Sequence, residues 1–145
     1  GMLPEKMRNS RLYGVELDPV SGRIAKQLYP KADITVGGFE TTDRRDFFDL
    51  AIGNVPFGQY QVNDKAYNKL NFNIHNYFFA KALDQVRPGG VVAFVTSRYT
   101  MDAKDSTAAC HGSDRIHTGD ARDLIHNLIR ALRQFLKCQL FILFR

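Results

Sequence analysis

Residues 54–57 read Asn-Val-Pro-Phe and bring a side-chain amide, backbone carbonyls and an aromatic ring together in one short loop. The preceding residues 49–53 (Asp-Leu-Ala-Ile-Gly) are typical of a buried strand. The proline removes a backbone donor and fixes its own φ, and Gly58 permits a sharp exit, so the loop is expected to be rigid. Ligands of open α/β sheets bind at such strand ends, although an ordinary strand-to-helix turn would use the same residue types.

The hydrophobic pattern around this loop predicts strands alternating with helices. Strands are expected at residues 11–17, 32–36, 47–52 and 91–95, and helices at residues 19–29 and 74–86. Residues 88–90 (Pro-Gly-Gly) are expected to form a tight turn. The order of the elements indicates an α/β fold with a mostly parallel sheet flanked by helices.

A polar connection, residues 59–73, follows the loop and is rich in Asn and Tyr. It contains Tyr60, Lys65, Tyr67 and Lys69 but little that would build a core, so we expect a solvated loop. A connection of this length inside a compact domain is usually functional or mobile.

Four stretches of the chain resemble one enzyme family when their order and spacing are taken together. They are residues 13–19 (Tyr-Gly-Val-Glu-Leu-Asp-Pro), 37–40 (Gly-Gly-Phe-Glu), the loop 54–57, and 87–95 (Arg-Pro-Gly-Gly-Val-Val-Ala-Phe-Val). The loop is similar to the Asn/Asp-Pro-Pro-Tyr/Phe motif of S-adenosylmethionine-dependent amino-methyltransferases. The chain looks most like N6-adenine DNA methyltransferases, particularly the methylase domains of large helicase–methylase proteins of mobile elements. The resemblance implies a partial Rossmann-like class I methyltransferase fold.

By this resemblance, Asn54, Val55, Pro56 and Phe57 carry the methyl transfer to a flipped adenine. The Asn54 side-chain oxygen and the Val55 carbonyl would each accept one proton of the N6 amine and direct its lone pair at the methyl sulfonium. Phe57 would stack on the base rotated out of the duplex. Val55 replaces the usual first proline of the motif, which is tolerable because its role is a backbone one.

The same resemblance assigns S-adenosylmethionine to the strand ends. Glu16 would bind the cofactor ribose, Leu17 would pack on its adenine and Asn54 would complete the site. Phe39 fits a stacking role on the adenine. Gly38 stands where relatives often have an acidic residue, so that hydrogen bond is absent or comes from another group, such as the glutamate that follows Phe39. From the residues alone, Glu16 also reads as a solvated strand-end charge and Phe39 as a core residue.

The composition fits one globular domain, with 145 residues of which 44% are hydrophobic and 24% charged. The net charge of +5 permits an anionic partner, and DNA is the expected partner of the full-length parent. Cys110 and Cys138 show no metal-ligand spacing, so no metal is expected, and reduced thiols indicate a cytoplasmic protein. No apolar run approaches the roughly 20 residues of a membrane span, so no membrane association is expected.

We expect two regions: a partial catalytic domain at residues 2–105 and a divergent tail at residues 106–145. The tail carries an amphipathic helix pattern at residues 120–136 and an apolar run at 140–144, and both frameshift and simple divergence would explain its lack of resemblance. The chain begins inside or after the helix that follows the family's glycine-rich cofactor loop. By this resemblance the loop is missing and the fragment is expected to be inactive alone.

Two alternatives stay open. A methyltransferase acting on RNA or on a protein glutamine would have the same fold and a nearly identical loop. A non-catalytic α/β binding module, self-associating through its C-terminal helix, is an alternative of another class.

Overall fold

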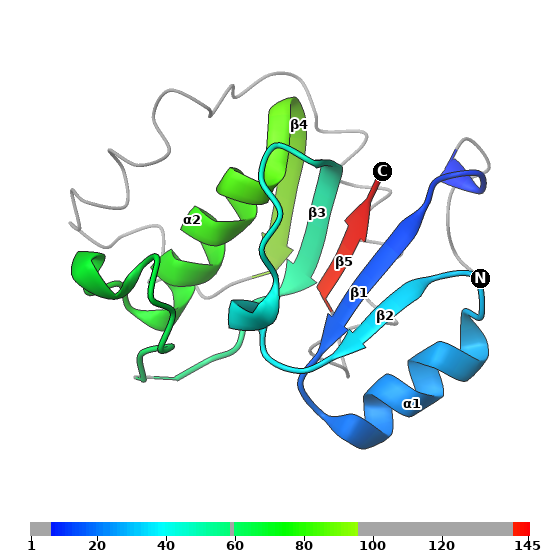
Figure 1. Cartoon of the computed structure of the whole chain (residues 1–145), viewed down its shortest axis with the longest axis horizontal. Coiled ribbons are helices and arrows are strands. Elements are labelled where there is room, and N and C mark those ends of the chain that lie inside the picture. The colour runs from blue at the N-terminus through cyan, green and yellow to red at the C-terminus, as the bar shows by residue number, and fades with distance from the viewer. Residues whose placement is uncertain (1–6, 59, 96–140) are drawn as a thin grey trace.

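The computed structural model describes residues 7–58, 60–95 and 141–145, which build one five-stranded sheet in the order β2-β1-β5-β3-β4 (Figure 1). The elements are β1 (Leu12–Glu16), α1 (Pro19–Leu28), β2 (Asp33–Val36), the 3-10 helix η2 (Phe39–Thr41), β3 (Phe48–Asn54), the 3-10 helix η3 (Asn68–Leu70), α2 (Ile74–Gln85), β4 (Val86–Val95) and β5 (Phe141–Phe144). The expected strands and helices of residues 11–95 are therefore confirmed with small shifts of their ends, except that the last of these strands, β4, begins at Val86 and not at residue 91.

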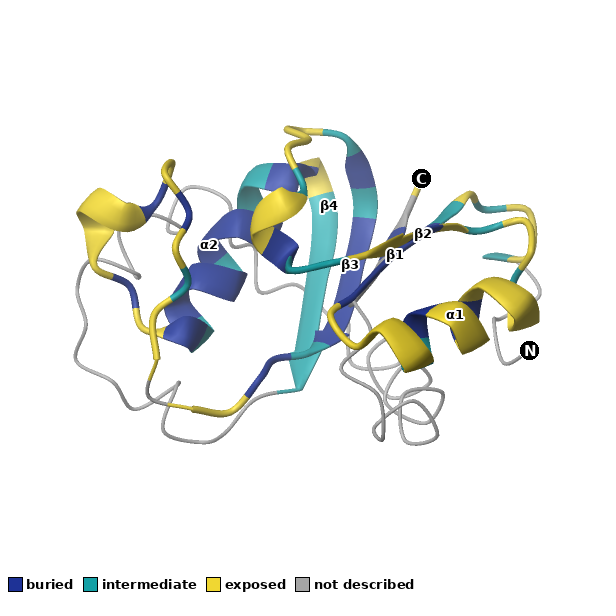
Figure 2. Cartoon of the chain, turned by 60° about the horizontal axis from the view of Figure 1, so that its bottom comes forward, coloured by how far each residue is buried: buried dark blue, intermediate teal, exposed yellow. Residues whose placement is uncertain are grey.

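The first half of the sheet is a β1-α1-β2 unit with parallel strands. Helix α1 begins where expected because the Asp18 carboxylate accepts the Ser21 N–H at 2.6 Å and a proline occupies the first turn. The helix approaches the sheet closely at Gly22, where an added Cβ would lie 2.6 Å from Val36 Cγ2. Most of the remaining surface of α1 is exposed (Figure 2).

The second half is a β3-α2-β4 unit, also with parallel strands. Helix α2 begins after Asn73, whose side chain accepts the Asn76 N–H at 2.9 Å. In contrast to α1, α2 is buried along most of its length (Figure 2). It packs on the sheet face that carries Tyr13 and Val15, in the main hydrophobic core. Because side chains alternate along a strand, this is the face opposite the one that α1 covers.

Strand β4 starts earlier than expected. Val86 already pairs with Phe48, and the register then shifts so that Val91 pairs with Leu50. The expected turn is therefore a bulge at the beginning of β4, in which Gly89 has a φ of +81°. Gly90 is required in this bulge, because a Cβ there would lie 2.8 Å from a backbone oxygen of β3.

Strand β5 lies in the middle of the sheet and is antiparallel to both neighbours, β1 and β3. The expectation of a mostly parallel sheet therefore holds for the two outer pairs, while the centre is antiparallel. The last residues of the expected tail belong to the same sheet as the rest. The expected helix at residues 120–136, Cys110 and Cys138 lie outside the described residues.

The polar connection contributes to the core, contrary to the expectation of a solvated loop. Tyr67 and Phe72 are both buried in the main hydrophobic cluster, and the Tyr67 hydroxyl donates to Asp84 at 2.7 Å. Lys65 and Lys69 are exposed, as expected. Local polarity concealed these core residues because their packing partners lie on α2 and not within the connection itself; the ring centroids of Tyr67 and Tyr77, for example, are 5.5 Å apart.

Leu143→Ala is expected to lower the free energy of unfolding by about 2–5 kcal/mol, because truncating a buried leucine leaves a cavity. Leu143 is 1% exposed in the central strand, whereas Leu28, at 67%, provides the matched control. Urea denaturation of both alanine variants measures the difference. If Leu143→Ala were as mild as Leu28→Ala, β5 would not occupy the middle of the sheet.

Candidate functional site

The carboxyl ends of three strands meet at one edge of the sheet. β1 and β3 are each antiparallel to β5, so they run in the same direction, and β2 is parallel to β1. Glu16 at the end of β1, Gly37 after β2 and Asn54 at the end of β3 therefore share this edge. The Gly37 N–H donates to the Glu16 carbonyl at 2.9 Å and holds two of the ends together.

A cavity of about 250 Å³, which we call the site cavity, opens at this edge. It brings together segments far apart in the chain, including the expected site residues Leu17, Phe39 and Pro56. Its lining consists of Val15, Leu17, Gly37, Gly38, Phe39, Glu40, Pro56, Tyr60, Gln61, Val62, Asn63, Ile74 and Phe78. The walls are thus η2 on one side and residues 60–63 of the connection on another.

Glu16 is 3% exposed. Its Oε1 accepts the Asp18 N–H at 3.0 Å, but its Oε2 is buried and has no hydrogen-bond partner among the described residues. The alternative of a solvated strand-end charge is therefore wrong. A buried carboxylate oxygen without a hydrogen-bond partner is costly. Glu16 itself is not among the residues that line the site cavity.

The loop that follows β3 shows the same feature. Asn54 Oδ1 is buried and also lacks a hydrogen-bond partner among the described residues. The next residue, Val55, is fully buried, and its N–H donates to the Val95 carbonyl of β4 at 3.1 Å. The backbone after Asn54 is therefore fixed by the sheet, and the loop holds its acceptor groups in place.

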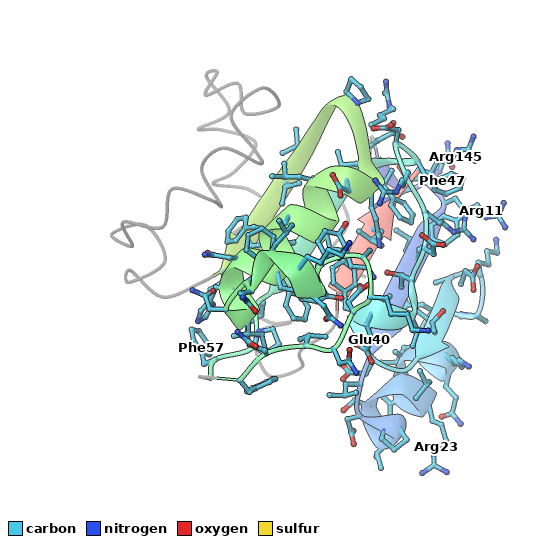
Figure 3. All side chains as sticks on the ribbon, turned by 60° about the vertical axis from the view of Figure 1, so that its left-hand side comes forward. Arg11, Arg23, Glu40, Phe47, Phe57 and Arg145 are labelled. Carbon is cyan, nitrogen blue, oxygen red and sulfur yellow. The ribbon has the colours of Figure 1, made fainter. Side chains whose placement is uncertain are left out.

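Phe57 lies at the surface beside the beginning of α2 (Figure 3). It is 58% exposed, and its ring meets that of His75 edge-on with the centroids 6.0 Å apart. An exposed aromatic ring next to a fixed strand end is suited to stacking on a planar ligand. Its expected role on a flipped base stays a prediction.

Phe39 is a core residue that also lines the site cavity. It is 4% exposed, and its ring stacks on Phe78 with the centroids 5.1 Å apart. The core alternative is thus confirmed for this residue. Its expected stacking on adenine stays a prediction, and one ring face is already used by Phe78.

Comparisons with known proteins identify the family. The Eco57I restriction-modification methylase family model matches residues 31–111, more than half of the chain. This chain belongs to that methylase family. The matched range contains the loop 54–57 and Phe39, whereas Glu16 and Leu17 precede it.

Two relatives of this methylase chain come from viruses. It is 34% identical over 86 residues to "Defense against restriction protein B" of Escherichia phage P1, which covers 55% of this chain and 4% of the relative. It is 46% identical over 50 residues to "Type II methyltransferase M.CvrRI" of Paramecium bursaria Chlorella virus XZ-6E, which covers 34% of this chain and 13% of the relative. The chain thus spans a small part of both relatives, and no solved structure matches it.

A buried polar network next to the site cavity was not found from the sequence. Asp64 Oδ2 accepts the Lys81 ammonium at 2.6 Å and the Tyr77 hydroxyl at 2.9 Å. Burial raises the pKa of the Asp64 carboxyl, but the hydrogen bonds from Lys81 and Tyr77 outweigh it and leave this pKa below the usual aspartate value. Burial and the bond to Asp64 together raise the pKa of the Tyr77 hydroxyl, so it stays a donor. Leaving one charge of such a buried pair unpaired typically costs about 3–5 kcal/mol.

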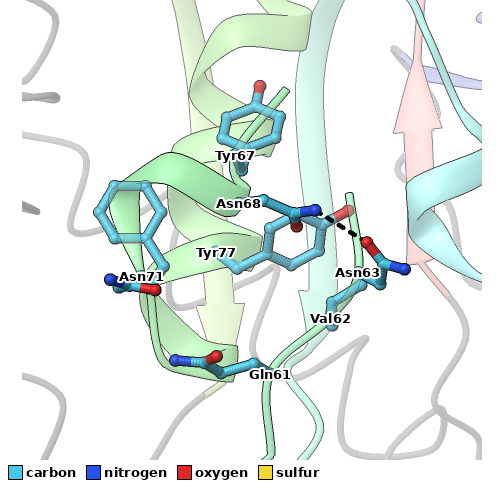
Figure 4. A pocket seen from close by; sticks show the side chains of 8 residues that line it. Gln61, Val62, Asn63, Tyr67, Asn68, Asn71 and Tyr77 are labelled. Atoms are coloured by element: carbon cyan, nitrogen blue, oxygen red, sulfur yellow. Dashed lines mark hydrogen bonds between the residues drawn. The ribbon is translucent and has the colours of Figure 1, made fainter. Parts of the chain in front are cut away.

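The methylase has a second cavity, of about 350 Å³, within the connection (Figure 4). Amide side chains and aromatic rings line it, and the Asn68 amide donates to Asn63 Oδ1 at 2.8 Å. Its lining consists of Gln61, Val62, Asn63, Tyr67, Asn68, Asn71, Phe72 and Tyr77. Residues 61–63 therefore separate this cavity from the site cavity.

The part of the chain that the structure describes comprises residues 7–58, 60–95 and 141–145. No group of three or more His, Cys, Asp or Glu side chains suited to a metal ion occurs in them. None of the helices described there has the length and apolar character needed to cross a membrane.

Asn54→Ala is expected to change the free energy of unfolding by less than about 0.5 kcal/mol, because the buried oxygen has no hydrogen-bond partner among the described residues. Asn73→Ala is the matched control and is expected to cost about 1 kcal/mol, since it removes the cap of α2. Urea denaturation compares the two variants. An equally large loss for Asn54→Ala would show that its amide has a structural role instead.

The stability of the methylase is expected to fall as the pH drops below about 4. The native pKa of Asp64 lies below its unfolded value, so its contribution is present above the unfolded pKa and is lost as the pH falls through the native one. Urea denaturation between pH 6 and pH 3 measures this, with Asp64→Asn expected to flatten the dependence. The exposed Asp33→Asn serves as control, and a dependence unchanged by Asp64→Asn contradicts the assignment.

Proposed function

We propose that this chain is part of a DNA adenine N6-methyltransferase, which transfers a methyl group from S-adenosylmethionine to an adenine rotated out of the duplex. The observation that carries the proposal is the buried Asn54 Oδ1, an acceptor without a partner among the described residues. It stands at the end of β3 beside the exposed ring of Phe57, in a chain of a restriction-modification methylase family. A buried acceptor that is unpaired in the free protein is available to a substrate donor.

The residues at the sheet edge fit the adenosine half of this cofactor. S-adenosylmethionine supplies a methyl group activated on a sulfonium. Leu17 and Phe39 offer apolar surface for a purine in the site cavity. Glu16 uses Oε1 for a backbone N–H, so Oε2 is the oxygen left for a ribose hydroxyl. The unpaired carboxylate oxygen thus supports the assignment of the ribose to this strand end.

The loop residues fit the amine of adenine. This amine is a poor nucleophile because its lone pair is delocalised into the ring. In the proposal, Asn54 Oδ1 and the Val55 carbonyl would each accept a hydrogen bond from the amine, which favours a pyramidal nitrogen with an available lone pair. The N–C bond would form as the S–C bond of the sulfonium breaks, with S-adenosylhomocysteine as leaving group and one amine proton lost to solvent. The hydrogen bond from the Val55 N–H to Val95 keeps the backbone of this loop in place. Phe57 stacks on the flipped base.

DNA is the preferred substrate because the matching family is described as a restriction-modification methylase and one relative as a type II methyltransferase. RNA or a protein glutamine would fit the same loop chemistry, but no observation on this chain favours either. A non-catalytic binding module could use the same two buried acceptors, so it is the match to a methylase family that favours an enzyme.

The activity belongs to a longer protein in this proposal, since the chain spans 4% and 13% of the two relatives. Inactivity of this chain alone, self-association through the tail and a cytoplasmic location stay predictions. Incubation with labelled S-adenosylmethionine and adenine-containing DNA tests the first of these, and we expect no transfer by the chain alone.

The adenosine half of the cofactor is expected to bind weakly and through Glu16. Saturation-transfer NMR with S-adenosylhomocysteine should show transfer to the adenine and ribose protons. Glu16→Gln should weaken binding by about tenfold, because it removes the charge that strengthens the hydrogen bond to a ribose hydroxyl.

Asp49→Asn is the control, because it neutralises a carboxylate at the beginning of β3, away from the site edge. It should leave the saturation transfer unchanged. Absence of any transfer to the wild-type chain, or equal binding by Glu16→Gln, contradicts the proposed cofactor site.

A further inference from the structure

A buried ion pair connects two walls of the site cavity. One wall is η2, where Glu40 follows Phe39, and another is residues 61–63, which end next to Asp64. The Lys81 ammonium on α2 donates to the Glu40 carbonyl at 3.2 Å and to the Asp64 carboxylate at 2.6 Å. One side chain thereby holds both walls.

The surroundings of Lys81 fix the position of its ammonium group. The side chains of Lys81 and Asp64 are only 6% and 9% exposed. The ring centroids of Phe39, Tyr67 and Tyr77 lie 5.6, 5.8 and 5.9 Å from the ammonium nitrogen. A charge so far from water depends on its partners, so the groups it binds are held where it lies.

The hydrogen bonds of Asp64 restrain the neighbouring wall, residues 61–63. Besides the ammonium, its carboxylate accepts the Tyr77 hydroxyl at 2.9 Å and the Ala66 N–H at 3.1 Å. Its own N–H donates to Asn68 Oδ1 at 2.9 Å. Both the side chain and the backbone of Asp64 are therefore fixed, directly after the last wall residue of the connection.

Stability alone does not explain a charged pair at this place. Replacing a buried ion pair by apolar residues of similar volume is often neutral or stabilising. Helix α2 is already buried along most of its length without the pair. The pair fixes the relative positions of two separate segments of the chain, because the hydrogen bonds of Lys81 to Glu40 and to Asp64 have a defined geometry.

We infer that Lys81 and Asp64 are positioning residues for the cofactor site, where they set the separation of the η2 wall and the wall at residues 61–63. The inference rests on the proposed function, because it takes the site cavity as the place of the adenosine half of the cofactor. Neither residue lines the cavity, so both act through the walls. Loss of either one weakens cofactor binding without removing a cofactor contact.

Tryptic digestion of the native chain tests the anchoring of the connection without any ligand. Lys65 and Lys69 are exposed in the connection, so cleavage after them reports its local opening. Lys81→Met and Asp64→Asn are each expected to raise this cleavage rate by about tenfold, because the connection opens more often without the ion pair. Mass spectrometry of the cleavage products measures the rate. Arg87→Gln is the control, because it removes the exposed ion pair with Asp49 and should leave the rate unchanged.

A double-mutant cycle on cofactor affinity tests the positioning role. Lys81→Met and Asp64→Asn should each weaken S-adenosylhomocysteine binding by about tenfold, and the double variant should bind no more weakly than either single one. A merely structural pair leaves the affinity of the folded fraction unchanged. Tyr77→Phe removes one hydrogen bond to Asp64 and keeps the ring, so it provides a milder variant if either charge variant does not fold.

The outcomes separate the two proposals. No binding by the wild-type chain overturns the proposed function, while the cleavage rates still report on the ion pair. Wild-type affinity in Lys81→Met and Asp64→Asn, independent effects in the double variant, or unchanged cleavage after Lys65 and Lys69 overturns the positioning role and leaves the proposed function intact.

Discussion

Strand β5 is the element through which the sheet is continuous. In the described sheet, β1 and β3 are each hydrogen-bonded to β5 rather than to one another. Glu16 ends a strand of one half, and Asn54 ends a strand of the other. The distance between the proposed ribose acceptor, Glu16, and the proposed amine acceptor, Asn54, therefore depends on the pairing of β5 with its two neighbours. Leu143 of β5 packs in the main hydrophobic core and helps to hold the strand in this position.

A second connection between the two halves runs through α2 and is polar. Lys81 bonds the Glu40 carbonyl, and the Gln85 amide donates to Thr42 Oγ1 at 2.6 Å. Apolar burial alone would allow the halves to slide, because dispersion contacts are non-directional. Hydrogen bonds of fixed geometry remove that freedom and suit a site assembled from both halves.

Local pattern predicted those parts of the fold that local chemistry determines. The hydrophobic pattern marks the two helices, α1 and α2, and alternating or continuous apolar runs mark β1 to β4. The same reasoning failed where a partner lies far along the chain. Lys81 and Asp64 are 17 residues apart, and Tyr67 in a polar connection gives no local sign of its bond to Asp84. The antiparallel pairing of β5 was equally hidden, because an apolar run specifies burial but not its neighbours.

The positions of the candidate site residues were easier to predict than their surroundings. Glu16 and Asn54 stand at strand ends, as expected, where the topology of an α/β sheet places ligand groups. Their roles toward a ligand stay predictions. The role of Phe39 could not be decided from residue type and position alone. An aromatic residue after a strand serves both core and ligand, and only the stacked ring of Phe78 reveals how much of it is already used.

The extent of the family likeness distinguishes the two connections between the halves. The matched residues 31–111 contain Glu40, Asp64 and Lys81, but they end before β5 and begin after Glu16. The hydrogen bonds that Lys81 makes to Glu40 and Asp64 therefore lie wholly within the matched part of the chain, and the central strand β5 lies outside it. In the proposed function, the directional contacts of Lys81 to the Glu40 carbonyl and the Asp64 carboxylate hold two walls of the site cavity within the matched segment. Strand β5 joins the two halves of the sheet from outside that segment.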